Sequence, residues 1–149
     1  NRNMSTTYSL TQAERINSKK QIDRIFKGGG SKAMTASPLR MVYMADERLK
    51  DARGPMAQMM VSVPKRFFKR AVKRNLIKRQ VREAYRLNKH IINDTLARTA
   101  DRDVSMCFIW TSNSLSTTAD VAVHMRNLLQ RLAERIERDR AKKDTEGHE

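Results

Sequence analysis

The most informative stretch of this chain is residues 65–89, KRFFKRAVKRNLIKRQVREAYRLNK. It contains eleven Lys or Arg residues and one acid, Glu83, and so carries +10 of the chain's net charge of +15. At about 100° per residue, the stretch has the periodicity of a helix. One side is mostly apolar and holds Ile77, Val81, Ala84, Tyr85, Asn88, Ile91 and Ile92. The other side holds a ladder of cations, Arg74, Lys78, Arg82 and Arg86, with Asn75 and Arg79 beside it.

The cationic side of this helix is typical of a surface that meets a polyanion. Ordinary solvated helix faces interleave acids with bases, because like charges four residues apart repel each other by a few tenths of a kcal/mol. Here three such repulsions follow one another, and only Glu83 offsets them. We therefore favour a nucleic-acid surface. A membrane surface and a merely solvated face remain as alternatives.

The composition is that of one globular domain. The chain has 149 residues, 39% hydrophobic and 32% charged, which is enough to bury a proper core. Its pI near 10.6 makes RNA, DNA or an anionic membrane the expected partner. The first ten residues lack the apolar core of a signal peptide, and the single cysteine, Cys107, cannot form an internal disulfide. These features predict a cytoplasmic protein without a membrane span.

Before the basic helix, the sequence predicts one helix and then a run of strands. Ser18 caps a helix over residues 19–27, and the three glycines at 28–30 end it. Residues 39–45 and 56–63 have the apolar character of strands, the second of which ends at Pro64 because proline has no N–H for a sheet ladder.

The basic helix is expected over residues 70–88, with a continuation to Ile92 left open. Residues 104–110, VSMCFIW, predict a strand buried on both faces. A last helix begins near residues 117–120 with a Thr-x-x-Asp capping pattern. The prediction is an α+β sandwich of about four strands and three helices, in the order α-β-β-β-α-β-α. Residues 1–9 are expected to be flexible, 10–138 to form the domain and 139–149 to be a disordered charged tail.

A search for catalytic chemistry finds little. His90, His124 and His148 have no Cys, Asp or Glu at metal-ligand spacing, and His124 is most simply a partly buried residue of the last helix. Cys107 is expected to be an inert thiol in a buried strand. The glycines at 28–30 follow a helix instead of opening one, which disfavours a phosphate-binding loop. The sequence therefore predicts a binding protein with no catalytic residue and no metal ligand of its own.

The basic stretch, together with the preceding VSVPK, resembles the signature of the bacterial ribonuclease P protein subunit. That family has a strand ending near Ser-Val-x-Lys-Lys, followed by Ala-Val-x-Arg-Asn-Arg-x-Lys-Arg-x-x-Arg-Glu-x-x-Arg. The matching residues are Ala71, Val72, Arg74, Asn75, Lys78, Arg79, Arg82, Glu83 and Arg86. The segment ERINSKKQIDRIFKGG also resembles the family's first helix, and the resemblance spans residues 10–138. Two positions depart from the family pattern: Leu76 replaces an arginine and Ile22 replaces an aromatic residue.

The resemblance implies a basic subunit that joins a large catalytic RNA, its expected partner. The complex would remove the 5′ leader from precursor tRNA by Mg²⁺-dependent hydrolysis, with the RNA and substrate holding the metal and the protein alone inactive. It implies a ribonuclease P protein-like fold, similar to the second domain of ribosomal protein S5, with a left-handed β-α-β crossover. It implies no membrane and no obligate protein partner.

The resemblance also implies two sets of site residues. The RNA-binding set is Arg70, Arg74, Asn75, Lys78, Arg79, Arg82, Arg86 and Lys89. The set that would line a cleft for the single-stranded leader is Phe26, Tyr43, Ser62 and Lys65. Arginines can pair bidentately with phosphates, and the aromatic rings could stack on bases. Core packing stays a rival role for both Phe26 and Tyr43, and it is the expected role of Phe67, Phe68 and Trp110.

Three other classes share part of this pattern. A structural RNA-binding protein of the ribosome would have the same charge and the same lack of catalytic groups. A DNA-binding helix protein would need a preceding helix-turn, which the sequence does not show. A protein-only nuclease would need an acidic metal cluster, and none is visible in the sequence.

Overall fold

The computed structural model describes the backbone of residues 9–146. A 3-10 helix, η1 (Gln12–Glu14), leads into α2 (Lys19–Lys27). Three strands follow: β1 (Lys32–Ala36), β2 (Leu39–Glu47) and β3 (Ala57–Ser62). Two consecutive helices, α3 (Ala71–Asn88) and α4 (His90–Thr99), then lead to β4 (Arg102–Trp110) and the long α5 (Thr118–Glu146). The α+β class predicted from the sequence is confirmed.

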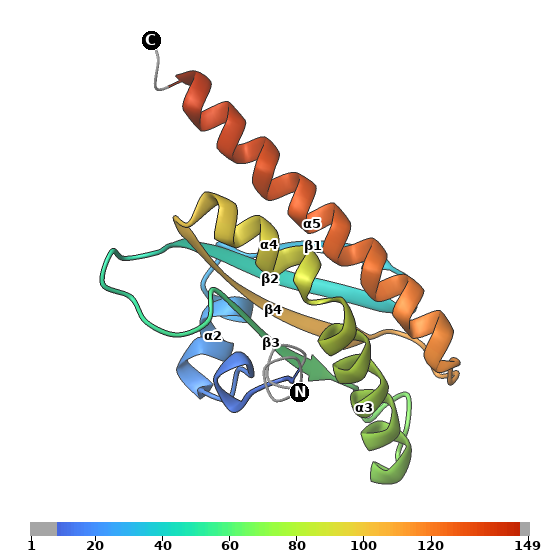
Figure 1. Cartoon of the computed structure of the whole chain (residues 1–149). Helices are drawn as coiled ribbons and strands as arrows, with labels where there is room; N and C mark the ends of the chain where they lie inside the picture. The colour runs from blue at the N-terminus through green and yellow to red at the C-terminus, as the bar shows by residue number, and fades with distance from the viewer. Residues whose placement is uncertain (1–8, 147–149) are drawn as a thin grey trace.

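The four strands form one mixed sheet in the order β1-β2-β4-β3. All neighbours are antiparallel except β3 and β4, which are parallel and are joined through α3 and α4. This connection is the expected strand–helix–strand crossover, and its left hand stays a prediction of the family resemblance. Helices α3, α4 and α5 cover one side of the sheet, here called the helical face, and α2 lies on the other side, here called the open face (Figure 1).

The core lies between the sheet and the helical layer. The side chains with no exposed surface include Trp110, Phe108 and Met106 from β4 and Ile77 and Tyr85 from α3. The rings of Tyr85 and Phe108 lie 6.0 Å apart between centroids, a normal spacing for packed aromatics. Because the apolar side of α3 is buried here, its cationic side must turn away from the core.

Both helix starts predicted from capping residues are confirmed. The Ser18 hydroxyl accepts a hydrogen bond from the backbone N–H of Gln21 at the start of α2. The Thr117 hydroxyl accepts one from the backbone N–H of Asp120 at the start of α5. Such caps satisfy N–H groups that have no partner inside the helix.

Three features differ from the prediction. No bounds were predicted for β1, a five-residue edge strand of mixed exposure that lacks a clear alternation of apolar residues. The segment after Asn88 forms a separate helix, α4, with Ile92, Thr95 and Leu96 buried. The tail from residue 139 was expected to be disordered, but α5 continues to Glu146.

The extension of α5 is held by tertiary contacts that its own pattern could not reveal. A guanidinium N–H of Arg140 donates to the carbonyl of Thr99 at 2.6 Å, and the same group lies 3.3 Å from a carboxylate oxygen of Asp101. Residues 1–8 and 147–149, also expected to be flexible or disordered, lie outside the described residues.

Candidate nucleic-acid interface

Helix α3 presents the expected cationic surface. Arg70, Asn75 and Arg79 are exposed, and Lys78 and Arg82 are half-buried beside them. In the described part of the chain, no carboxylate lies within 4.0 Å of the charged groups of Lys78, Arg79 or Arg82. Among the described residues these three cations therefore have no ion-pair partner, which leaves them available to phosphates.

Arg15, which the site prediction omitted, belongs to the same surface. It lies in the segment that pairs with Met59 of β3. Burial and, to a lesser extent, the charge of Arg15 lower the pKa of Arg82. Two cations whose charges act on each other repel, and an anion bound between them would offset the repulsion. The signal in the sequence was a cation just before the first helix, and only the fold places it next to α3.

Two members of the predicted RNA-binding set have partners within the protein. Arg74 donates from one guanidinium nitrogen to the carbonyls of Phe68 and Lys69, at 2.8 and 2.7 Å, and so closes the loop before α3. Arg86 donates to both carboxylate oxygens of Glu83, at 3.0 and 2.5 Å. The hydrogen bond from Arg86 lowers the pKa of Glu83, and burial only partly opposes it. Both arginines are half-buried.

Lys89 does not belong to the interface, contrary to the prediction. It is 7% exposed, and its ammonium lies 3.0 and 2.9 Å from the two carboxylate oxygens of Glu14 and 2.5 Å from the carbonyl of Ser9. The family resemblance put it in the RNA-binding set. In the fold it is the junction residue between α3 and α4, and the N-terminal segment covers it.

Tyr43 is not on the open face, and its prediction as a leader-binding aromatic is wrong. It is 4% exposed and belongs to the core of the helical face. Its neighbours in β2, Val42 and Met44, point to the other side because side chains alternate along a strand. A shift of one residue in register therefore moves the aromatic ring from the cleft to the core.

Of the remaining three residues of the predicted cleft, Phe26 and Ser62 lie on the open face. Phe26, near the end of α2, is 48% exposed, and Lys65 is exposed just beyond β3. Ser62 lies opposite Ile109 of β4, which in turn lies opposite Arg40 of β2. The side chains of Ser62, Ile109 and Arg40 form a row across the open face. Arg40 adds a cation that the sequence prediction missed.

Two depressions flank α2 on the open face. The first, a groove of about 420 Å³, is lined by Phe26, Arg40, Val42, Ile109 and neighbouring residues. It combines an exposed aromatic ring, an apolar floor and a cation, the elements that single-stranded nucleic acid uses for stacking and phosphate contact.

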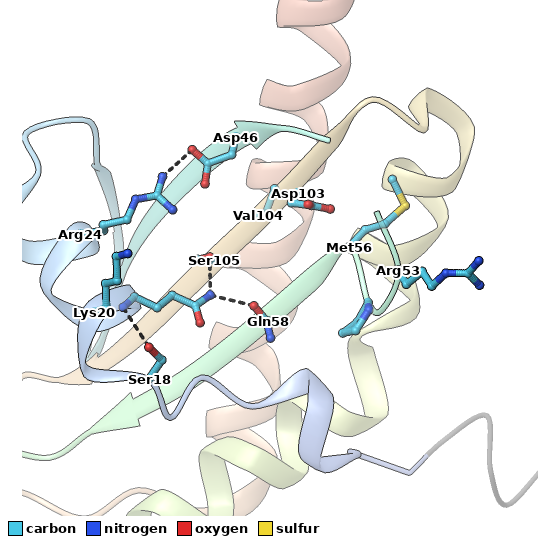
Figure 2. A pocket seen from close by; sticks show the side chains of 12 residues that line it. Ser18, Lys20, Arg24, Asp46, Arg53, Met56, Gln58, Asp103, Val104 and Ser105 are labelled. Atoms are coloured by element: carbon cyan, nitrogen blue, oxygen red, sulfur yellow. Dashed lines mark hydrogen bonds and ion pairs between the residues drawn. The ribbon is translucent and has the colours of Figure 1, made fainter. Parts of the chain in front are cut away.

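The second depression, of about 390 Å³, is polar and lies between α2 and the loop before β3 (Figure 2). The side-chain amide of Gln21 donates to Gln58 at 2.7 Å and to Ser105 at 3.1 Å, and so ties α2 to β3 and β4. Arg24 points to Asp46, with 2.9 Å between guanidinium and carboxylate (Figure 2). The polar groups of this second depression are thus largely hydrogen-bonded or ion-paired with one another.

The described residues supply no metal-binding cluster. No group of three or more His, Cys, Asp or Glu within them could hold a metal ion, so they do not fit a protein-bound Mg²⁺. Burial raises the pKa of the Cys107 thiol to about 12, which leaves it protonated at neutral pH. None of the described helices is long and apolar enough to cross a membrane.

Comparison with known proteins gives a consistent result. Residues 10–133 match the family model described as Ribonuclease P. The chain is 40% identical over 129 residues to the ribonuclease P protein component of Porphyromonas gingivalis, covering 85% of this chain and 88% of the relative. It is 31% identical over 144 residues to that of Chlorobaculum tepidum, covering 90% and 92%.

Solved structures agree on the fold. The ribonuclease P protein of Thermotoga maritima superposes with a TM-score of 0.58 at 22% identity, over 79% of this chain and 96% of that one. A mutant of the Staphylococcus aureus protein gives 0.59 at 21% identity, over 80% and 87%.

Proposed function

Because this chain belongs to the ribonuclease P protein family, we propose that it binds a catalytic RNA and the 5′ leader of precursor tRNA. The observation that carries the proposal is the group of Lys78, Arg79 and Arg82, three cations on one side of α3 without an acidic partner among the described residues. The complex would remove the leader by hydrolysis of one phosphodiester bond, in the cytoplasm.

The cationic side of α3 is proposed to dock on the catalytic RNA. Arg79 is exposed, and Arg82 lies close enough to Arg15 for their charges to interact. Guanidinium groups pair bidentately with phosphate oxygens, which gives affinity and orientation. Asn75 is exposed and neutral within this surface, and its amide can bond a base edge or a 2′-hydroxyl.

The groove at Phe26 is proposed to hold the leader. A base stacked on an aromatic side chain contributes about 1–3 kcal/mol. Arg40, which lines the groove, and Lys65, which is exposed just beyond β3, would contact phosphates of the leader. The helix α2, which carries Phe26, is tied to the sheet through Gln21, so the ring is held over the groove before RNA arrives.

The chemistry is proposed to belong to the RNA, as the family resemblance implies. Mg²⁺ would be held mainly by the catalytic RNA and the substrate. The residues of this chain would position the leader and neutralise phosphates, which strengthens binding of the precursor over the mature product.

Reconstitution tests the proposal. The purified protein, the cognate catalytic RNA and a 5′-labelled precursor tRNA are mixed with Mg²⁺ at near-physiological salt. We expect leader removal to be stimulated by the protein and to be absent with the protein alone. Robust cleavage without RNA would overturn the proposed division of labour. Co-purification of ribosomal RNA instead of a catalytic RNA would support a structural protein of the ribosome.

A further inference from the structure

A third depression, lined mainly by basic residues, lies away from the proposed RNA surfaces. It has a volume of about 110 Å³ and lies where the edge of the sheet meets α5 on the helical face. The argument uses five of its lining residues, Lys32, Tyr43, Arg102, Arg135 and Asp139, and we call it the edge pocket. It contains no residue of α3 and none of the groove at Phe26 except the shared Lys32.

The sheet register explains why these side chains meet. Lys32 of β1 is the direct partner of Tyr43 in β2, so both point to the helical face. Arg102 is the first residue of β4 and points to the same face two positions before buried Val104. Arg135 and Asp139 are four residues apart on α5 and so lie on one side of that helix.

The pocket has a surplus of positive charge. Its lining holds three cations and one carboxylate. Asp139 lies 3.6 Å from Arg135, both about 40% exposed, which is a weak contact. Within the part of the chain that the structure describes, Lys32 and Arg102 make no ion pair, although Glu47 lies opposite Arg102 in the β2–β4 ladder. Three cations this close repel one another unless an anion lies between them.

Tyr43 adds a neutral donor to this pocket. Its ring packs in the core, and the phenol end reaches the lining near Arg135 and Asp139, whose charges both act on it. Burial, the largest effect on this group, raises its pKa, so the hydroxyl keeps its proton and can donate. No hydrogen bond from this hydroxyl to another described residue is present.

We propose that the edge pocket binds a single phosphate group, held by Lys32, Arg102 and Arg135 and by a hydrogen bond from the Tyr43 hydroxyl. A volume of about 110 Å³ leaves space for a phosphate among these side chains. The phosphate comes either from the end of an RNA strand or from free phosphate, and this site lies on the other face of the sheet from the proposed leader groove.

The test is an NMR titration of the full-length, isotopically labelled protein at constant ionic strength. Three ligands are compared: inorganic phosphate, a short RNA with a 5′-monophosphate and the same RNA with a 5′-hydroxyl. The variants are Tyr43→Phe, which removes only the hydroxyl, and Arg102→Gln. The matched control is Arg126→Gln, which removes an exposed arginine of α5 outside the pocket. Unchanged amide spectra away from each substitution show that the variants fold.

We expect phosphate to shift the amide signals of Gly30, Tyr43, Ala45 and Arg102. Tyr43→Phe and Arg102→Gln should each weaken this binding by about tenfold, and Arg126→Gln should leave it unchanged. If the pocket variants weaken binding of the 5′-phosphorylated RNA alone, the phosphate belongs to RNA. If they also weaken binding of free phosphate, the pocket recognises phosphate itself. Equal affinities of wild type and both pocket variants for all ligands would overturn the proposal.

Discussion

The ammonium of Lys89 lies 2.9 Å from a carboxylate oxygen of Glu14, and both side chains are about nine-tenths buried. This ion pair joins the first described segment of the chain to the junction of α3 and α4. The Glu14 carboxylate also accepts from the backbone N–H and the hydroxyl of Thr11, at 3.1 and 3.0 Å. The N-terminal segment is therefore fixed beside the cationic surface, where it places Arg15.

Breaking this pair should destabilise the protein. Replacement of Lys89 by Met leaves Glu14 as a buried charge without its cation, which we expect to cost about 3 kcal/mol in the free energy of unfolding. Denaturant titration measures this change. Lys69→Met, at an exposed lysine, is the control and should be nearly neutral. If Lys89→Met kept full stability, the ion pair would have no structural role.

Removing the cations of α3 should weaken RNA binding without unfolding the protein. Each of Lys78→Ala, Arg79→Ala and Arg82→Ala should reduce the slope of log affinity against log salt by about one. Filter binding to the catalytic RNA at several salt concentrations measures the slope. Arg126→Gln removes one charge from an exposed position of α5, outside this surface, and should keep the wild-type slope. If replacing all three residues together left the slope unchanged, α3 would not belong to the interface.

Phe26 and Tyr43, the two aromatic residues of the predicted cleft, should behave differently from each other. Phe26→Ala removes an exposed ring from the groove and should weaken binding of a long-leader precursor by about tenfold. A precursor with a one-nucleotide leader should be unaffected. Tyr43→Phe keeps the core ring and should affect the long-leader and the short-leader precursor equally. Affinities of the reconstituted complex for the two precursors test this, and equal losses for both with Phe26→Ala would exclude stacking on the leader.

The ion pair of Glu83 with Arg86 predicts a pH dependence of stability. The hydrogen bond from Arg86 lowers the pKa of Glu83 below its ordinary value of 4.5. Its contribution is therefore present above about pH 4.5 and is lost as the pH falls through the lower pKa of the folded state. Glu83→Gln should flatten the stability profile between about pH 5 and about pH 3. An unchanged profile in this variant would show that the pair does not persist in solution.

Cys107 should be unreactive in the folded protein. Its side chain has no exposed surface, and burial raises the pKa of its thiol to about 12. A disulfide reagent at about pH 8 should label it only after denaturant is added. Rapid labelling under native conditions would mean that β4 opens far more readily than its central place in the sheet indicates.

Helices α3 and α5 show most clearly how much of the structure the sequence alone predicts. The apolar period of α3 placed Ile77, Val81 and Tyr85 in the core, and the same period turned Lys78, Arg79 and Arg82 outward. Capping residues located the starts of α2 and α5. These features depend on neighbours within one or two turns of the chain, and helix periodicity expresses them directly.

The tertiary structure decided what depends on distant segments. Lys89 and Arg79 look alike in the sequence, yet one is buried against Glu14, 75 positions earlier, and the other is exposed. Tyr43 lies in the core because the strand register, set by pairing with β1 and β4, determines which face each residue takes. Local pattern specifies that a residue is charged or aromatic. Burial and interaction partners depend on segments that only folding brings together. The sequence could therefore predict the type of site, but not every residue that forms it.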